Sequence, residues 1–185
     1  AYLEGHVPSF EQLERTLATG VGAATVFPVV CGSAVARVAL DRLVDLICEI
    51  GPSPADRPPV TVAAGDTTTE VAPDVAGPPL AFVFKTVADP FAGRITVFRV
   101  LAGAAKGDAT LTNGRTHGKE RLGALLLLQG KEHHQATEFV AGDIGAVAKL
   151  KETRAGDWLA ERDEPIQMPA VELPQPVMAF AMEPK

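Results

Sequence analysis

The sequence predicts a mixed, mainly β protein in which an antiparallel β-barrel or sandwich follows a partial α/β segment of helix, strand and helix. Residues 80–159 contain short apolar runs with period-two alternation, separated by turn residues at the spacing of roughly eight to twelve positions that is typical of barrels and sandwiches. Residues 1–50 carry apolar residues at helical spacing instead. The stretch between them is rich in Pro, Thr, Asp and Gly, as linkers are. The predicted parts are an α/β segment, a linker, a barrel and the start of a further domain: residues 1–52, 53–79, 80–173 and 174–185.

The first segment predicts two helices around a buried strand. Ser9, with Gln12 three positions later, is typical of a capping box, and Gly20 lies where that helix would end. The continuous apolar run ATVFPVVCG, residues 24–32, predicts a strand that is buried on both faces. A second helix over residues 33–50 then presents one apolar stripe and is closed by Gly51-Pro52. That stripe comprises Val35, Ala39, Leu43, Leu46, Ile47 and Ile50.

The linker and barrel segments predict short strands joined by tight turns. One strand is expected in the linker at PVTVAA, residues 59–64. In KTVADPFAGRITVFRVLAG, two alternating runs flank Asp89-Pro90 and Gly93, which predicts a hairpin whose turn uses the conformational freedom of glycine. Asn113-Gly114 is a strong tight-turn dipeptide. The alternation in PQPVMAFAMEPK, residues 174–185, predicts a final strand.

Composition and charge narrow the class of protein. Hydrophobic residues make up 46% and charged residues 22% of the 185, which is typical of a globular domain with an ample core. No apolar stretch is long enough for a membrane span, and the opening AYLEGHVPSFEQ does not resemble a signal peptide, so we expect a cytoplasmic protein without a membrane partner. Cys31 and Cys48 have no metal-ligand spacing and are expected to be buried thiols in a reducing compartment.

The net charge of −6 argues against a generic nucleic-acid binder, but the charge is unevenly distributed. Residues 80–150 contain nine Lys and Arg against six Asp and Glu, a difference of +3. The rest of the chain contains eight against seventeen, a difference of −9. The strand-rich middle is therefore mildly basic within an acidic chain.

Several stretches together resemble elongation factor G and related translational GTPases. They are VVCGSA, LVDLICEIGPSP, AFVFKTVADPFAGRITVFRVLAG, AGDIGAVAKLKETRAGDWL and PQPVMAFAMEPK, in this order. The resemblance implies that residues 1–52 are the end of the guanine-nucleotide domain, that residues 80–173 are the domain II β-barrel, and that residues 174–185 begin domain III. VARVALDR and LGALLLLQG depart from the usual pattern, so the sequence resembles a divergent or paralogous member.

The resemblance implies a GTPase parent that binds GTP and Mg²⁺, whereas the fragment is expected to have no catalytic residues and no cofactor of its own. A phosphate-binding loop of the form G-x-x-x-x-G-K-[ST] does not occur in the sequence. By the resemblance, Ser33 and Ala34 of CGSA would pack against the guanine base, with a backbone N–H on its oxygen. From the residues alone, Ser33 is a helix N-cap, which is the role expected in this fragment, whereas both roles are expected in the intact parent.

Two clusters are candidates for contact with ribosomal RNA or with the neighbouring domain. The first is the hairpin turn with Phe91, Gly93 and Arg94, which by resemblance lies near the nucleotide domain and the ribosome, and which is otherwise a tight strand connection. The second is NGRTHGKERLG, in which Arg115, Lys119 and Arg121 surround a turn. Such a cluster suits RNA phosphates, although a solvated turn is the commoner meaning of three basic residues.

No metal or catalytic site is expected at the remaining histidines and acidic residues. Neighbouring residues on a strand point to opposite faces, so His133-His134 is expected to be exposed and not to ligate one metal ion. Trp158 is expected in the core. The acidic pairs show no arrangement for acid–base chemistry.

Two functional hypotheses follow. In the first, the chain is the ribosome-associated part of an elongation factor G-like GTPase, which docks on small-subunit RNA and relays nucleotide state from the GTPase domain in cis during translocation or recycling. A ribosomal protection protein or a release factor of the same superfamily is a sibling of this hypothesis. In the second, the barrel is a scaffold or protein-interaction domain of a diverged paralogue.

Overall fold

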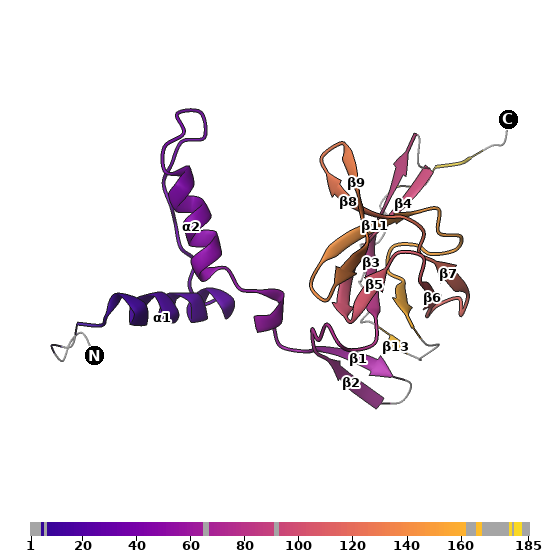
Figure 1. Ribbon diagram of the computed structural model, residues 1–185, viewed down its shortest axis with the longest axis horizontal. Helices are drawn as coiled ribbons and strands as arrows, with labels where there is room; N and C mark the ends of the chain where they lie inside the picture. The colour runs from indigo at the N-terminus through magenta and orange to yellow at the C-terminus, as the bar shows by residue number, and fades with distance from the viewer. Residues whose placement is uncertain are drawn as a thin grey trace. The chain divides into compact units, whose positions relative to one another are not determined.

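The computed structural model describes residues 5, 7–64, 67–90, 93–161, 166–167, 178 and 180–182. The chain divides into two compact units, Ala1–Pro59 and Val60–Lys185, which are considered separately (Figure 1). Unit 1 contains the helices and unit 2 the strands. Neither helix among the described residues has the length and apolar character that crossing a membrane would require.

The first helix confirms the predicted capping box. Helix α1 spans Phe10–Gly22. The Ser9 hydroxyl accepts a hydrogen bond from the Gln12 N–H (3.3 Å), and the Gln12 side-chain oxygen accepts one from the Ser9 N–H (3.0 Å). The helix runs past Gly20, and the Ala23 N–H caps it by donating to the Thr19 carbonyl.

The predicted buried strand at residues 24–32 is wrong. These residues have no strand conformation, and Phe27 and Val29 are 78% and 88% exposed. A strand buried on both faces needs neighbouring strands to pair its N–H and C=O groups, and no described residue of unit 1 belongs to one. For the same reason Cys31 is exposed, as is Cys48 on the second helix, so the prediction of two buried thiols is also wrong.

The second helix is shorter than predicted. Helix α2 spans Leu40–Ile50, and the predicted N-cap, Ser33, lies in a turn before it. Ser33 and Val38 exchange two backbone hydrogen bonds (3.1 and 3.0 Å), and the Ser33 hydroxyl accepts from the Ala36 N–H (3.1 Å). Ala39, the residue before the helix, has a positive φ of 58°, which stops the helix from extending toward Ser33. Of the predicted apolar stripe, only Ile50 is buried.

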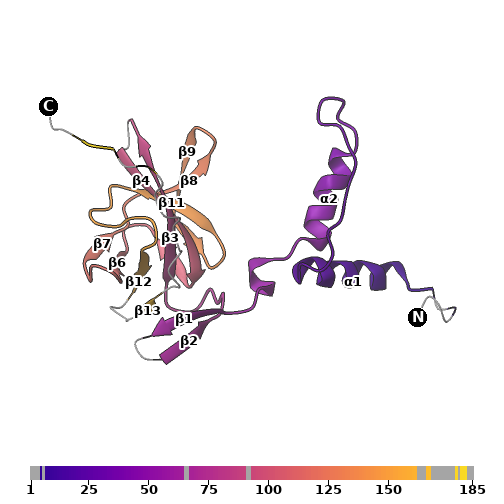
Figure 2. The same ribbon diagram turned by 180° about the vertical axis from the view of Figure 1, so that it is seen from behind.

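The stretch predicted as a linker contains two strands. β1 (Val60–Ala64) confirms the strand expected at residues 59–64, and β2 (Thr67–Val71), which the sequence analysis did not predict, pairs with it antiparallel. β13 (Ile166–Gln167) pairs with the other side of β1. Val62 is 1% exposed and belongs to a small core with Leu80 and Trp158. Figures 1 and 2 both show β1 and β2 at one end of the larger sheet.

The barrel segment confirms the predicted antiparallel, mainly β fold. Its largest sheet has eight strands in the order β7-β6-β12-β3-β4-β11-β8-β9. The strands of this sheet are β3 (Leu80–Asp89), β4 (Gly93–Ala102), β6 (Thr110–Asn113), β7 (Lys119–Arg121), β8 (Leu125–Gln129), β9 (Glu132–Ala136), β11 (Ile144–Ala148) and β12 (Trp158–Ala160). β3 and β4 form the predicted hairpin, in which Asp89 pairs with Gly93.

The sheet curves around one core in a barrel-like fold. A second ladder joins β5 (Ala104–Lys106) to β10 (Glu138–Val140), and no ladder among the described strands joins β7 directly to β9. Between those edges, the Asp108 N–H donates to the Leu122 carbonyl (2.6 Å), and the Gly107 N–H donates to the Thr137 carbonyl (2.9 Å). The enclosed core draws on both sheets and contains Ala81, Val83, Phe98, Val100, Ala105, Leu111, Leu122, Leu125, Phe139, Val147, Leu150 and Leu159.

Two further predictions concern the end of the chain. Trp158 is 5% exposed, which confirms its predicted place in a core. The strand predicted at residues 174–185 lies mostly outside the described residues, and the described residues 178 and 180–182 have no strand conformation.

Candidate nucleic-acid interface

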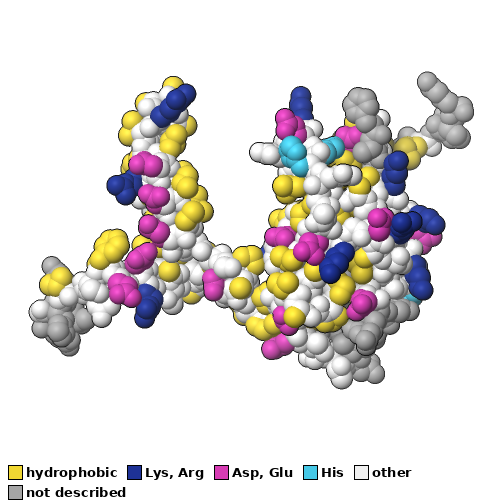
Figure 3. Space-filling model, in the orientation of Figure 1, with side chains coloured by type: hydrophobic (Ala, Val, Ile, Leu, Met, Phe, Trp, Pro, Cys, Tyr) yellow, Lys and Arg dark blue, Asp and Glu magenta, His cyan; other side chains and the backbone are white. Residues whose placement is uncertain are grey.

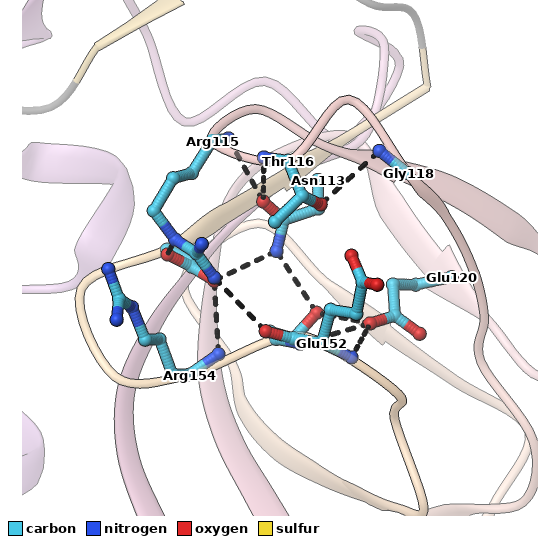
Figure 4. Close-up of polar contacts among 9 residues, drawn as sticks. Asn113, Arg115, Thr116, Gly118, Glu120, Glu152 and Arg154 are labelled. Carbon is cyan, nitrogen blue, oxygen red and sulfur yellow. Dashed lines mark hydrogen bonds and ion pairs between the residues drawn. The ribbon is translucent and has the colours of Figure 1, made fainter.

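The loop of residues 149–157, between β11 and β12, is held by a buried carboxylate on β7 (Figure 4). β7 alternates exposed and buried residues, so Lys119 and Arg121 face solvent while Glu120 faces inward and is 3% exposed. The Glu120 carboxylate accepts hydrogen bonds from the N–H groups of Lys151 (3.0 Å), Glu152 (2.8 Å) and Thr153 (3.0 Å). The Thr153 hydroxyl donates a fourth bond (2.9 Å). One side chain therefore orients three successive residues of the loop.

Asp157, at the end of the same loop, is a second buried anchor. Its carboxylate accepts from Arg115 Nε (2.6 Å) and Nη2 (2.9 Å), a bidentate pair. It also accepts from Asn113 Nδ2 (2.9 Å) and from the Arg154 N–H (3.0 Å). Asp157 is 3% exposed, so these four bonds satisfy a carboxylate that has little contact with water.

Asn113 joins this anchor to the turn that follows β6. Its side chain is fully buried; the amide nitrogen also donates to Thr153 Oγ1 (3.1 Å), and the amide oxygen accepts from the N–H groups of Arg115 (2.9 Å) and Thr116 (3.1 Å). The turn predicted at Asn113-Gly114 is thus confirmed. Gly114 is required there because a Cβ on it would overlap the indole ring of Trp158.

Arg94, the candidate least explained by packing, has a structural role. Its Nη2 donates to the carbonyl oxygens of Leu150 (2.6 Å) and Lys151 (2.9 Å), which ties β4 to the same loop. Gly93 beside it has a φ of +76°, as the tight hairpin turn requires. Phe91, the third candidate of this cluster, lies outside the described residues.

The two anchors are stable as carboxylates. Burial raises the pKa of Glu120, but the backbone hydrogen bonds from Lys151, Glu152 and Thr153 and the bond from the Thr153 hydroxyl outweigh it, so the pKa lies below its ordinary value of 4.5. Burial likewise raises the pKa of Asp157, and hydrogen bonds from Arg115, Asn113 and Arg154 lower it below its ordinary value of 3.8. Each carboxyl group accepts its hydrogen bonds as an anion, and protonation would disrupt these bonds.

Acidification is therefore expected to destabilise unit 2. A carboxyl group with a lower pKa in the folded than in the unfolded state contributes stability that is present above its unfolded pKa and is lost as the pH falls through its folded pKa. We expect the free energy of unfolding, measured by urea titration, to be constant near neutrality and to fall below roughly pH 4.5. Glu120→Gln, which cannot titrate, should show a shallower fall; an equally steep fall in this variant would contradict the assignment.

Of the four predicted basic candidates, two contact this loop and a third lies next to its anchor Glu120. Arg94 and Arg115 bind its carbonyl and carboxylate groups, and Lys119 precedes its anchor on β7. Arg121 instead pairs with Asp108 (3.0 Å) in a mostly exposed ion pair. Three basic residues that the sequence analysis did not select lie on the loop itself: Lys149, Lys151 and Arg154. Their signal was the spacing Lys-x-Lys-x-x-Arg in KLKETR.

The result is a basic surface on which Glu120 and Asp157 are buried and Glu152 is exposed. It is here called the 149–157 surface and is made of Arg94, Arg115, Lys119, Lys149, Lys151 and Arg154. Within the described part of the chain, no hydrogen bond or ion pair occupies the side-chain nitrogens of Lys119, Lys149, Lys151 or Arg154. In Figure 3, Lys and Arg side chains gather along the side of unit 2 where β7 lies in Figure 1. This arrangement can bind phosphate groups.

The proposed contact of Ser33 and Ala34 with a guanine base stays a prediction. Ser33 is half-buried and Ala34 exposed, both in the turn before α2. The Ser33 N–H is bonded to the Val38 carbonyl, whereas the Ala34 N–H has no partner among the described residues. His133 and His134 are exposed on β9, as predicted, and no group of three potential metal ligands occurs in the described residues.

Comparisons with known proteins agree with this structure. Residues 78–162 match the family described as elongation factor G domain 2. A crystal structure of a protein from Thermus thermophilus is similar to the chain, with a TM-score of 0.69 and 30% sequence identity. The match covers 95% of this chain and 24% of that protein, so the chain spans about a quarter of the length of this relative.

Proposed function

Residues 78–162 are an elongation factor G domain 2, and on this premise we propose that the chain is the ribosome-associated part of a translational GTPase. The 149–157 surface would contact the phosphate backbone of small-subunit ribosomal RNA. The observation that carries the proposal is the arrangement of six basic side chains around one loop that two buried carboxylates hold in place.

The charge balance of the surface supports RNA as its partner. Glu120 and Asp157 lie beside the basic residues in sequence and space, yet both are buried and occupied by internal donors. Glu152 is the acidic residue of the loop that remains exposed. Lys and Arg side chains on a loop whose backbone is held in place position a protein on nucleic acid through phosphate contacts and carry no sequence information.

The nucleotide-dependent part of the proposal concerns the parent protein. A domain 2 alone is not catalytic, and GTP with its Mg²⁺ would be bound largely by residues outside this chain. Ser33 and Ala34 would contact the guanine base, and the unoccupied Ala34 N–H suits a hydrogen bond to a base oxygen. Nucleotide state would reach the barrel through the GTPase domain in cis, by ordering of segments around the γ-phosphate.

Removing the unpaired lysines is expected to weaken binding to RNA. Each phosphate contact that is lost should lower the magnitude of the slope of log K against log salt by about one. Lys119→Ala with Lys151→Ala should therefore lower it by about two, in titrations of labelled chain with purified small ribosomal subunits. Both substitutions leave the backbone bond from Lys151 to Glu120 available.

Lys131→Ala is the matched control, because Lys131 is an exposed lysine in the turn between β8 and β9. It should leave the slope unchanged. An effect of the control half as large as that of the double variant, which removes twice the charge, would show that the binding is a property of net charge and not of the 149–157 surface.

Co-sedimentation of the intact parent with ribosomes, with and without a non-hydrolysable GTP analogue, tests the functional class. Nucleotide-dependent binding supports a translational GTPase, whether it acts in translocation, recycling, ribosomal protection or release. Absence of ribosome binding in both conditions would leave the scaffold or protein-interaction role in a diverged paralogue.

A further inference from the structure

Among the strands that the structure describes, none pairs with the outer edge of β2 over residues 68–71. β1 and β2 pair along their whole length, and β13 occupies the other side of β1, so β2 is the last strand of its sheet. The backbone N–H and C=O groups along such an edge can accept another strand.

A cavity of about 330 Å³ opens beside this edge. It lies between β2 and the ends of three barrel strands, and its apolar wall includes Val71, Pro79, Leu80, Ala102 and Ala160. Leu80, Ala102 and Ala160 are buried members of the small core that Val62 shares, so the wall is part of a packed structure. The volume is in the range of small ligand pockets and would take one or two aliphatic side chains.

The rim of the cavity is acidic. Glu70, Asp74 and Glu161 border it, and no basic residue among those that the structure describes does. The side chains of Glu70 and Glu161 form no hydrogen bond or ion pair within the described residues. Glu70 and Val71 are neighbours on β2, so they point to opposite faces of the sheet.

We propose that the edge of β2 and the adjoining cavity bind an extended segment of a partner protein in which aliphatic residues alternate with Lys or Arg. The segment adds a strand to β2, so that its backbone groups pair with the edge. Because directly opposed residues of paired strands share a face, aliphatic side chains beside Val71 enter the cavity while basic side chains lie beside Glu70. This interaction is separate from the proposed RNA contact and uses none of its residues.

A fluorescein-labelled peptide Lys-Val-Lys-Val-Lys tests the proposal by fluorescence anisotropy with the full chain. Glu-Val-Glu-Val-Glu keeps the strand propensity and reverses the charge, and Lys-Ser-Lys-Ser-Lys keeps the charge and removes the aliphatic groups. We expect saturable binding of the first peptide alone. Equal binding of the first and third peptides, or binding of none, would overturn the proposal.

Backbone methylation distinguishes strand addition from a general attraction to acidic groups. Only alternate N–H groups of an added strand face its partner. Two peptides, N-methylated at odd or at even positions, should therefore differ, with one losing binding and the other retaining it. Equal binding of both peptides would overturn strand addition.

Variants of the chain test the rim. Glu70→Gln with Glu161→Gln should raise the dissociation constant of the Lys-Val peptide by about twofold to fivefold for each charge pair removed. Glu138→Gln, an exposed carboxylate on β10, is the matched control and should have no effect. Equal affinities of the rim variant and the control, with both folded by circular dichroism, would contradict a role for the rim. Sedimentation showing that the chain alone dimerises, together with failure of the dimer to bind the peptide, would assign the edge to a second copy and overturn the proposal.

Discussion

Asp157→Ala is expected to lower the free energy of unfolding of unit 2 by about 2–3 kcal/mol. The substitution leaves the buried amide of Asn113 without one of its acceptors and removes the bidentate partner of Arg115. It also frees the Arg154 N–H, which orders the end of the loop. The cost comes mainly from the buried Asn113 amide, which loses an acceptor away from water, because the Arg115 side chain is 39% exposed and its charge is partly solvated. Urea unfolding followed by Trp158 fluorescence measures the loss, since the indole lies beside the affected turn.

Asp108→Asn is the matched control for this prediction, because Asp108 has a φ of 63°, which Asn tolerates better than Ala. Asp108 also pairs with an arginine, Arg121, at 3.0 Å, but both side chains are more than 70% exposed. The exposed pair should contribute no more than about 1 kcal/mol. Similar losses in the two variants would show that the Asp157 network does not behave as a buried anchor.

Phe98→Ala is expected to cost about 3–5 kcal/mol of unfolding free energy, because it leaves a cavity at the centre of the barrel core. Phe98 is fully buried on β4, opposite Val83 on β3 and Gly145 on β11. Its ring meets that of Phe139 edge-to-face, with the ring centroids 6.1 Å apart. Phe139 in turn lies against the backbone of Gly145, where an added Cβ would overlap its ring. Loss of the Phe98 ring therefore removes contacts on three strands at once.

Phe84→Ala provides the comparison. Phe84 lies on the adjacent β3 but is 43% exposed, so its truncation should cost less than about 1 kcal/mol. Thermal or urea unfolding of both variants, with the wild-type chain as reference, measures the difference. A loss in Phe84→Ala as large as that in Phe98→Ala would show that the core is not organised around the Phe98–Phe139 pair.

The elements that the sequence predicted correctly are those with local physical causes. The capping box at Ser9 and Gln12 involves residues three apart, and the β3–β4 hairpin follows from alternation and a glycine turn. The turn at Asn113-Gly114 likewise depends on residues that are close in the sequence, since the Asn113 side chain accepts from the Thr116 N–H. The strand at residues 24–32 failed because burial on both faces depends on neighbouring strands, which the described residues of unit 1 do not contain.

The candidate interface was also predicted from the sequence only in part. By itself, the sequence determined that a strand-rich segment carries an excess of basic residues, and that Arg94, Arg115 and Lys119 are among its candidates. Only the tertiary structure decided that they meet at residues 149–157, because the contacts that join them span some 30 to 60 positions: Glu120 to Lys151, Arg115 to Asp157 and Arg94 to Leu150. A local pattern cannot encode such pairs, since they form only when the sheet curves and brings distant strands together around one core.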